Sequence, residues 1–480
     1  MTAQPLTAGG RTVAARHPIA ILVVILLSYF MVLLDNSVIF TALPSLEVDL
    51  GLGPGELSWV QDAYTLVFGG LLLLGARAGD LLGRRGVFVA GLAIFAAASL
   101  AIGLAPSGGW LIGARAVQGV GAAIVAPTSL ALLTATFPAG RERARAVALY
   151  GATAGIGASL GMVVGGACAE LLSWRAGFFL NVPIGIAMIV LAPRYLPETA
   201  RATGRFDLVG ALTATLGVGS LVFAIITAAE QGWTATPTLV AGAVGILLLV
   251  GFVVNESVAP QPILPLRLLR SRVRVGAYLA RLLYMGAMIG FFFFTTQFLQ
   301  DVLRFTPLQA GLGFLPMTVV NFAVALAVTR VVRSIGAGPT LVAGIVLTLV
   351  GVAWLSRVVP ESDYLTAVAA PMLVIGAGQG LAFAPLTAAG IAGVAAADAG
   401  AASGLVNTFH QVGMSLGLGV LVVVAAGAHG TDAAASVAAE VAAALTAAAV
   451  LLTLCAIVAA TLVLPPLMRE RRAHTRKDTP

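Results

Sequence analysis

The chain has 480 residues, of which 59% are hydrophobic and 10% are charged, and its formal net charge is +7. Soluble domains usually contain about 25% charged residues, so this composition excludes an ordinary soluble protein and predicts a membrane protein. The arginines are spread along the chain and indicate no nucleic-acid-binding surface. The single lysine, Lys477, leaves no residue for a phosphate-binding loop of the ATPase type.

Fourteen apolar runs follow one another, each long enough for a helix of about 20 residues that crosses a bilayer. The runs are apolar on all sides, which favours helices over the short alternating strands of a barrel. The predicted fold class is therefore an all-α membrane protein. The approximate spans are 19–43, 57–76, 86–105, 110–136, 145–170, 178–196, 207–229, 238–257, 275–299, 311–332, 339–357, 366–392, 401–427 and 441–467.

The basic residues support this map because they gather in alternate loops. With the N-terminus inside, 22 of the 27 lysines and arginines lie on the inner side, and only Arg175, Arg304 and Arg357 lie on the outer side. The positive-inside rule then predicts that both termini are cytoplasmic and that the number of helices is even. The longest loop, 258–274, is too short for a folded domain, so the function must lie within or between the helices.

Three charged residues stand inside the early runs: Asp35 in the first, Asp62 in the second and Arg115 in the fourth. Their positions place all three in the outer half of the membrane, where a charge is costly and usually functional. An aspartate that alternates between a proton and an arginine partner would couple transport to protons. The alternatives are a static ion pair that locks the packing and, for Asp62, a side chain that reaches the outer surface.

Later runs contain weaker signals. Glycines at every fourth position of the fifth run make a smooth face for close helix contact, whether for static packing or for sliding. Arg281 in the ninth run is expected to extend toward the inner surface. Polar or flexible side chains on later runs line either a substrate cavity or another helix; these candidates are Gln297, Met317, Asn321, Gln379, Asn407, His410 and Gln411.

Several motifs resemble the 14-helix drug:proton antiporter branch of the major facilitator superfamily. They occur in the expected order along nearly the whole chain: Leu34-Asp35-Asn36-Ser37-Val38 with Ala42-Leu43-Pro44, Gly79-Asp80-Leu81-Leu82-Gly83-Arg84-Arg85, Arg115-Ala116-Val117-Gln118-Gly119-Val120-Gly121, Trp174-Arg175 with Asn181-Val182-Pro183-Ile184-Gly185, and Phe298-Leu299-Gln300 with Thr306-Pro307-Leu308-Gln309-Ala310-Gly311. The chain departs from the pattern at Ala76, Leu81 and Met162, where the family has glycine, a basic residue and proline.

The resemblance implies the major facilitator fold, with two six-helix bundles and two extra helices. The implied divisions are residues 1–200, 201–260, 261–467 and a basic cytoplasmic tail at 468–480. It also implies a cytoplasmic gate, a fourth-helix motif and an antiporter-like fifth-helix motif. The residues concerned are, respectively, Gly79, Asp80, Gly83, Arg84 and Arg85; Arg115, Gln118 and Gly119; and Gly157, Gly161, Gly165 and Gly166. The gate is expected to latch the two bundles together.

The predicted function is proton-coupled export of amphipathic drugs, antibiotics or secondary metabolites by alternating access. The alternative is a uniporter or a proton symporter for a small nutrient, which Met162 favours because the bend expected from proline is missing. The sequence contains no catalytic set, no metal-ligand cluster and no cofactor motif, so we do not expect an enzyme. The expected partners are protons, a small-molecule substrate and the lipid bilayer of the cell membrane, with the protein acting as a monomer.

Overall fold

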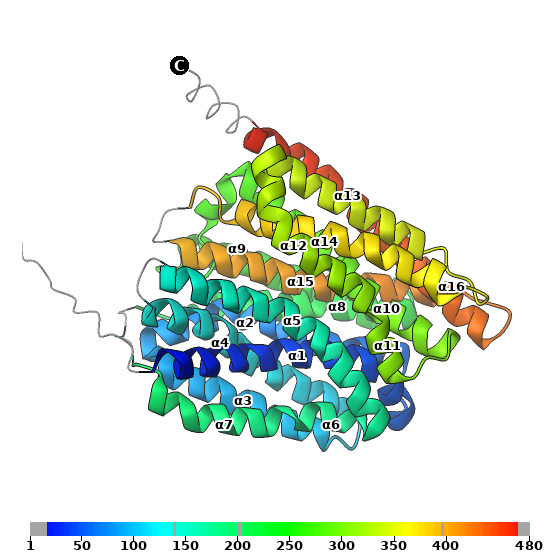
Figure 1. Ribbon diagram of the computed structural model, residues 1–480, viewed down its shortest axis with the longest axis horizontal. Helices are drawn as coiled ribbons and strands as arrows, with labels where there is room; N and C mark the ends of the chain where they lie inside the picture. Colours follow the sequence, from blue (N-terminus) through cyan, green and yellow to red (C-terminus); the bar gives the residue numbers. More distant parts are fainter. Residues whose placement is uncertain (1–16, 138–140, 199–200, 202–203, 395–397, 469–480) are drawn as a thin grey trace, which may run out of the picture.

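The structure is a computed structural model, and it describes residues 17–137, 141–198, 201, 204–394 and 398–468 (Figure 1). These residues form helices joined by short turns, and no strand occurs among them. The α-helices are α1 Pro18–Leu50, α2 Pro54–Leu82, α3 Arg84–Gly103, α4 Gly108–Thr136, α5 Arg141–Leu171, α6 Trp174–Phe179, α7 Asn181–Tyr195, α8 Leu208–Gln231, α9 Thr236–Val258, α10 Arg272–Gln297, α11 Pro307–Gly313, α12 Leu315–Ile335, α13 Ala337–Leu355, α14 Ala370–Gly390, α15 Ala399–Ala426 and α16 Ala433–Val458. Short 3-10 or π turns stand at Leu266–Arg270, Phe298–Val302, Leu365–Ala369 and Ala459–Val463.

Within the described residues, 13 helical segments are long and apolar enough to cross a membrane. The helix α5 takes the place of the fifth predicted run and has 31 residues, although only part of it has described side chains. The order of helices therefore agrees with the fourteen predicted runs. Two spans are interrupted, since α6 and α7 together make one crossing and α11 and α12 make another.

Three predicted boundaries are wrong: α1 ends at Leu50 and not at 43, α2 ends at Leu82 and not at 76, and α16 begins at Ala433 and not at 441. The first of these is notable because α1 continues through Pro44. A proline inside a helix removes one backbone hydrogen bond, yet α1 continues, and the proline's neighbours Leu43 and Leu46 are buried. The helix ends at Gly51, whose φ of 63° is the left-handed conformation typical of a residue that follows a helix.

In each half of the chain, a glycine with a positive φ makes a sharp turn between two membrane helices. Gly83 joins α2 to α3 with φ of 104°, and Gly336 joins α12 to α13 with φ of 99°. Residues with side chains rarely adopt such angles. At Gly83 the space is also limited, because a Cβ would lie 2.8 Å from Oε1 of Glu198. Glycine in the gate motif is thus required by the tight turn between two membrane helices.

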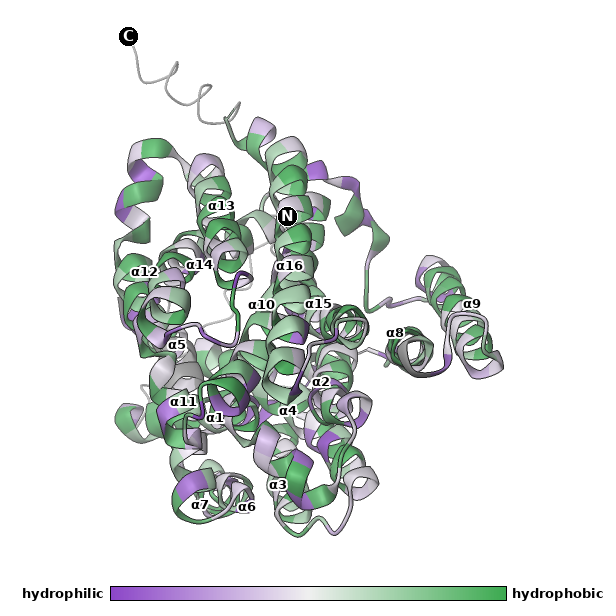
Figure 2. Ribbon diagram, turned by 90° about the vertical axis from the view of Figure 1, so that its right-hand side faces the viewer, coloured by the Kyte–Doolittle hydropathy of each residue, from purple (hydrophilic) through white to green (hydrophobic). Residues whose placement is uncertain are grey.

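The helices form two bundles, α1–α7 and α10–α16, that meet along α2 and α15. We call this α2–α15 contact the seam. The pair α8 and α9 packs on itself and, through α8, on α2 and α15, so that it covers the seam from one side (Figure 2). This arrangement agrees with the fold that the resemblance to the major facilitator superfamily implied, two six-helix bundles with two added helices.

The two ends of the bundles differ in charge. One end, at the left of Figure 1, contains the start of α1; we call it the arginine-rich face because it includes Arg77, Arg84, Arg85, Arg194, Arg267, Arg274, Arg330 and Arg333. The other end, which we call the opposite face, includes Arg175, Arg304 and Arg357. Toward the opposite face the two bundles touch: Gln300 donates to the carbonyl of Thr41 at 3.2 Å, and the Phe40 and Phe292 rings stack at 5.6 Å.

Candidate functional site

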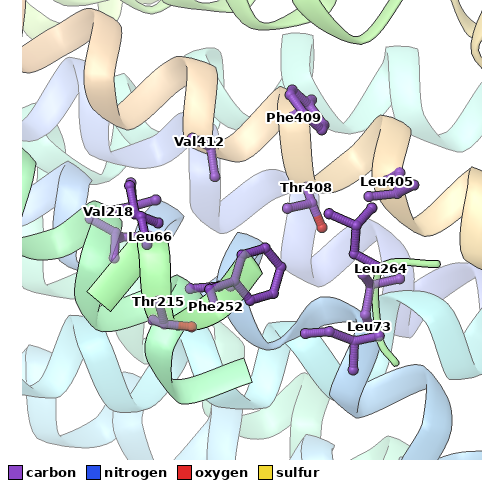
Figure 3. Close-up of a pocket in the computed structure, with 14 residues that line it drawn as sticks. Leu66, Leu73, Thr215, Val218, Phe252, Leu264, Leu405, Thr408, Phe409 and Val412 are labelled. Carbon is purple, nitrogen blue, oxygen red and sulfur yellow. The ribbon is translucent and has the colours of Figure 1, made fainter. Parts of the chain in front are cut away.

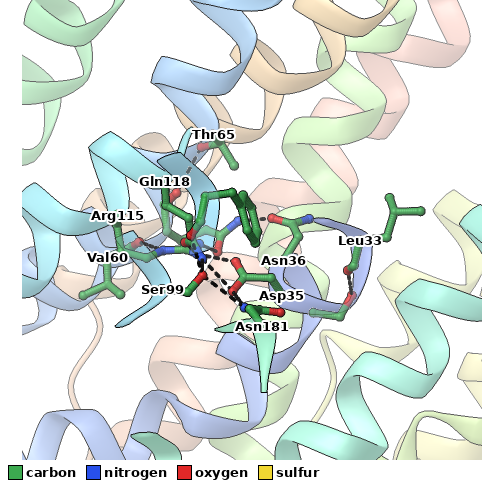
Figure 4. Close-up of polar contacts among 12 residues, drawn as sticks. Leu33, Asp35, Asn36, Val60, Thr65, Ser99, Arg115, Gln118 and Asn181 are labelled. Carbon is green, nitrogen blue, oxygen red and sulfur yellow. Dashed lines mark hydrogen bonds and ion pairs between the residues drawn. The ribbon is translucent and has the colours of Figure 1, made fainter. Parts of the chain in front are cut away.

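Asp35 on α1 lies in a buried polar network that connects several helices of the first bundle (Figure 4). Its carboxylate forms an ion pair with Arg115 of α4 at 2.8 Å, and both side chains are 0% exposed. Gln118 and Asn181 also donate hydrogen bonds to Asp35, at 2.8 and 2.7 Å. The structure thus pairs these two opposite charges, as both a coupling device and a static ion pair would require.

The rest of the Arg115 guanidinium is also bound. Its Nε donates to the carbonyl of Val60 at 3.0 Å, and its Nη1 donates to Gln118 at 2.7 Å. Its carbon Cζ lies 4.3 Å from the centre of the Tyr64 ring, a cation–π contact. Gln61 connects this group to α1, since its Nε2 donates to Oδ1 of Asn36 at 3.0 Å. Every charge in the network therefore has partners.

This network closes Asp35 to solvent. Removing one partner from a buried ion pair usually costs about 3–5 kcal/mol, because the other charge is left uncompensated. In the conformation described here, neither water nor substrate reaches the Asp35 carboxylate, which is 0% exposed. Asp35 can therefore exchange a proton only in a conformation that opens its contact with Arg115.

Asp62 has a different environment. It lies on α2, is 0% exposed, and has no hydrogen-bond partner on either carboxylate oxygen. The Ser415 hydroxyl of α15 faces it, beyond hydrogen-bond distance. One turn away on α15, Gln411 packs against Gly69 of α2, where a Cβ would lie 2.5 Å from Cβ of Gln411. Asp62 thus faces the seam, and the alternative that it reaches the outer surface is wrong.

The gate residues lie at the arginine-rich face. Arg84 binds Asp80 at 2.9 Å and the carbonyl of Ala131 at 3.2 Å. Arg85 binds Glu198 at 3.3 Å and the carbonyl of Leu196 at 3.3 Å. These described contacts connect α2 and α3 with α4 and with the end of α7, all within the first bundle. The expected latch between the bundles is not among them in this conformation.

The glycines of the fifth helix divide into two groups. Gly157, Gly161 and Gly165 pack on α1, and a Cβ at Gly161 would lie 2.7 Å from the carbonyl oxygen of Leu34. Gly166 instead meets the second bundle, where a Cβ would lie 2.3 Å from the carbonyl oxygen of Pro307. Three glycines therefore serve contact inside the first bundle, and Gly166 serves the contact of α5 with α11. In the fourth-helix motif, Gly119 lets α4 approach the Tyr64 carbonyl on α2.

The cavity candidates stand on the helices α10, α12, α14 and α15. The backbones of Met317 and Asn321 on α12 pack against Gly376 and Gly380 of α14. Gln411 is buried at the seam, and Gln297 ends α10 near the opposite face. Of the remaining candidates, Gln379 and His410 are half-buried, and Asn407 is exposed and donates to the carbonyl of Ser403 at 3.1 Å.

The prediction for Arg281 is wrong. It was expected to extend to the inner surface, but it is 3% exposed. Its Cζ lies 4.0 Å from the centre of the Phe383 ring on α14, and the Phe383 ring meets His410 of α15 edge to face at 6.2 Å. A flat guanidinium stacks well on an aromatic face. The second bundle therefore contains a buried cation of its own, held against an aromatic ring.

A pocket of about 160 Å³ lies on the other side of α15 (Figure 3). Its walls come from α2, α8, α9, α15 and the segment before α10, and Thr215 and Thr408 are its polar residues. None of the predicted cavity residues lines it. Among the described residues, no group of three or more His, Cys, Asp or Glu side chains is placed to hold a metal ion.

Sequence reasoning missed several members of these clusters. Gln61, Ser99 and Asn36 complete the network around Asp35, and Ser415 stands beside Asp62. Their signal was present, because each is a polar side chain in an otherwise apolar run, and such residues usually find partners inside the protein. Phe383 had no such signal, since an aromatic residue in an apolar run is unremarkable until its neighbours are known.

Comparisons with known proteins agree with this geometry. The family model described as "Major Facilitator Superfamily" matches residues 25–418. The chain is 40% identical to the cephamycin export protein CmcT of Amycolatopsis lactamdurans, over 96% of this chain and 95% of that one. It is 38% identical to the puromycin resistance protein pur8 of Streptomyces alboniger, over 87% of this chain and 85% of that one.

Solved structures share the fold at low sequence identity. A peptide transporter POT crystallised with sulfate superposes with a TM-score of 0.67 at 14% identity, covering 94% of this chain and 97% of that one. A bacterial homologue of the human lysosomal transporter Spinster gives 0.67 at 14% identity, covering 95% and 98%. The chain is therefore a multi-pass membrane protein that belongs to the major facilitator superfamily, in its drug:proton antiporter branch.

Proposed function

We propose that this protein exports amphipathic small molecules, such as antibiotics, other drugs or secondary metabolites, across the cell membrane in exchange for protons. It would act as a monomer with both termini in the cytoplasm and would catalyse no chemical reaction. Relatives named for cephamycin export and puromycin resistance support the direction and the kind of cargo. The arginine-rich face would be cytoplasmic, following the positive-inside rule. The terminal segments 1–16 and 469–480 lie outside the described residues.

The contacts between the bundles support the proposal that, in this conformation, the substrate cavity opens to the cytoplasm. Contacts between α1 and α10, and between α5 and α11, close the molecule toward the opposite face. There the backbone N–H of Leu308 also donates to Glu170 of α5 at 3.1 Å. At the arginine-rich face, the described gate contacts of Asp80 and Arg85 remain within the first bundle. In this proposal the gate latches the bundles only after they have rocked to the other conformation.

The observation that carries the proposal is the buried, unpartnered carboxyl of Asp62 at the seam between the bundles. A carboxylate that is ionised and unpartnered in a dry site is strongly unfavourable, whereas a protonated carboxyl is not. We therefore assign a proton to Asp62 in this conformation. A proton taken up from outside would reach the cytoplasm when the seam loosens, and cargo would then bind.

Asp35 and Arg115 form the second part of the coupling device. Because their pair is sealed in this conformation, we place Asp62 before Asp35 as the proton carrier. Asp35 would take a proton only when rocking of the bundles separates it from Arg115. Asp35 and Asp62 would thus be charged or neutral in different combinations in the two conformations, while Arg115 stays charged.

Two measurements test the function. In a bacterial strain lacking its own drug pumps, expression should raise resistance to cefoxitin, a cephamycin, or to puromycin. In inside-out vesicles that enclose a pH-sensitive dye, entry of the exported compound should then make the lumen more alkaline, because a proton leaves as cargo enters. Acidification would identify a symporter, an unchanged lumen would identify a uniporter, and either result would overturn proton antiport.

A further inference from the structure

Arg281 is a buried cation without an anion. Its atoms Nε and Nη1 are shielded from solvent and have no hydrogen-bond partner, and the residue is 3% exposed. The ion pairs found among the described residues involve Arg84, Arg85, Arg115, Arg175 and Arg267, but not Arg281. The two buried arginines of the membrane region therefore differ: Arg115 has a full set of partners, and Arg281 keeps part of its donor set unused.

A guanidinium stays protonated in proteins, so Arg281 cannot lower the cost of its burial by losing a proton. Stacking on Phe383 compensates for part of that cost. The unused donors still lack what a guanidinium fork binds best, a planar anionic group such as a carboxylate. A site of this kind is incomplete until an anion arrives.

The surroundings of Arg281 place it toward the space between the bundles. Along α15, Gly404, Thr408 and Gln411 contact α2, while Gly413 and Gly417 contact α10. The helical period of 3.6 residues per turn puts Ser403, Asn407 and His410 on the remaining side, which is turned away from α8. His410 meets Phe383 on that side, and Phe383 is 39% exposed. The Phe383 ring and the His410 imidazole thus lie together beside Arg281 on this side of α15.

We propose that Arg281, Phe383 and His410 form a recognition site for the anionic group of an amphipathic substrate. The guanidinium would bind a carboxylate or sulfonate through its unused donors, and the exposed part of the Phe383 ring would contact the adjoining apolar portion. This inference rests on the proposed export function and names its substrate class as organic anions. An anionic lipid headgroup has the same chemistry, so the experiment must separate these two sources.

The test is equilibrium binding to the purified protein in phosphatidylcholine nanodiscs. The probes are pyrenebutyrate and pyrenebutanol, which share an apolar body and differ in the carboxylate. We expect the wild type to bind the acid about tenfold more tightly than the alcohol, as a charge-assisted hydrogen bond implies. Arg281→Gln should abolish this preference and leave the affinity for the alcohol unchanged. Arg281→Lys should retain part of it, and the exposed Arg330→Gln should retain all of it.

The unfolding temperature provides a second test. If Arg281 had a purely structural role, replacing it would lower the unfolding temperature, whereas the proposal predicts a rise. Without ligand, Arg281→Gln should unfold at a higher temperature than the wild type, because it removes an uncompensated buried charge. A lower unfolding temperature, or an acid preference that survives in Arg281→Gln, would overturn the proposal. Equal affinity of the wild type for both probes would do the same.

Two further results show which part of the proposal is wrong if the test fails. If phosphatidylglycerol in the nanodiscs removes pyrenebutyrate binding, the site belongs to a lipid headgroup and the substrate assignment is wrong. Because binding is measured at one pH on both sides, it does not require transport. Lost acid preference with intact proton-linked export would remove only the anion assignment, whereas intact preference without export would remove only the proposed function.

Discussion

Gly166 provides the most direct mechanical test of the two-state model. It is the fifth-helix glycine that meets the second bundle, and in this conformation a Cβ would lie 2.3 Å from the carbonyl oxygen of Pro307 and 2.8 Å from Cα of Leu308. Both are backbone atoms, so no side chain can turn aside to make room. Gly166→Ala must therefore push α5 away from α11 or move the whole protein to a conformation in which they are apart.

The size of the effect follows from this overlap. Inserting a methyl group into a closely packed contact typically costs about 1–3 kcal/mol. This amount shifts a two-state equilibrium by a factor of about 5 to 150. Gly311 on α11 approaches from the other side, since a Cβ there would lie 2.4 Å from the carbonyl oxygen of Met162. Gly311→Ala should therefore shift the equilibrium in the same direction.

The shift can be read by pulsed electron spin resonance. Spin labels at Leu172 and Val359, which are 77% and 50% exposed at the opposite face, report on the separation of the two bundles there. Cys168 and Cys455 are first replaced by serine and alanine. Gly166→Ala should raise the population of molecules with the longer distance between the two labels. Gly151→Ala on the same helix, where nothing lies within 4 Å of an added Cβ, should leave this population unchanged. An unchanged distance distribution in Gly166→Ala would refute the reasoning.

Three further predictions concern charge. Arg115→Gln should lower the free energy of unfolding by about 3–5 kcal/mol, and Asp35→Asn in the same chain should restore part of it. If the losses of the two single variants, measured by denaturation, simply add up in the double variant, the two residues are not coupled. Asp35→Asn alone should insert normally and lose proton-linked efflux, and normal efflux under a pH gradient would exclude its role. At the arginine-rich face, the hydrogen bond from Arg267 holds the pKa of Asp398 below its usual range. That pair should stabilise the protein above the ordinary aspartate pKa and lose its effect as the pH falls through the lowered pKa. The unfolding temperatures of wild type and Asp398→Asn should therefore converge in acid, and a constant difference would contradict the assignment.

The sequence predicted the architecture because a membrane leaves few choices. Apolar runs must be helices, and the alternation of arginines sets their direction. The pairing of Asp35 with Arg115 was also predictable, since two opposite charges at one depth have little else to bind. The continuation of α1 past Pro44 was not, because it depends on packing around one missing hydrogen bond.

The site was less predictable because it depends on which side each helix presents. Asp62 would be a surface residue if α2 were turned, and its place at the seam depends on how α2 and α15 pack against each other. Arg281 was expected to extend to the surface because the sequence does not reveal that Phe383, about a hundred residues later, covers it. Gly166 differs from Gly165 by one position, yet one contacts α11 and the other contacts α1.

The central claim is that Asp62 exchanges the transported proton, and it is tested most directly by proteoliposomes with an imposed pH gradient. Wild-type protein should accumulate the exported compound against its gradient. Asp62→Asn should equilibrate the compound without accumulating it and without changing lumenal pH, whereas Glu361→Gln, an exposed loop acid, should behave as wild type. If Asp62→Asn accumulates the compound as the wild type does, Asp62 is not the proton carrier and the account fails.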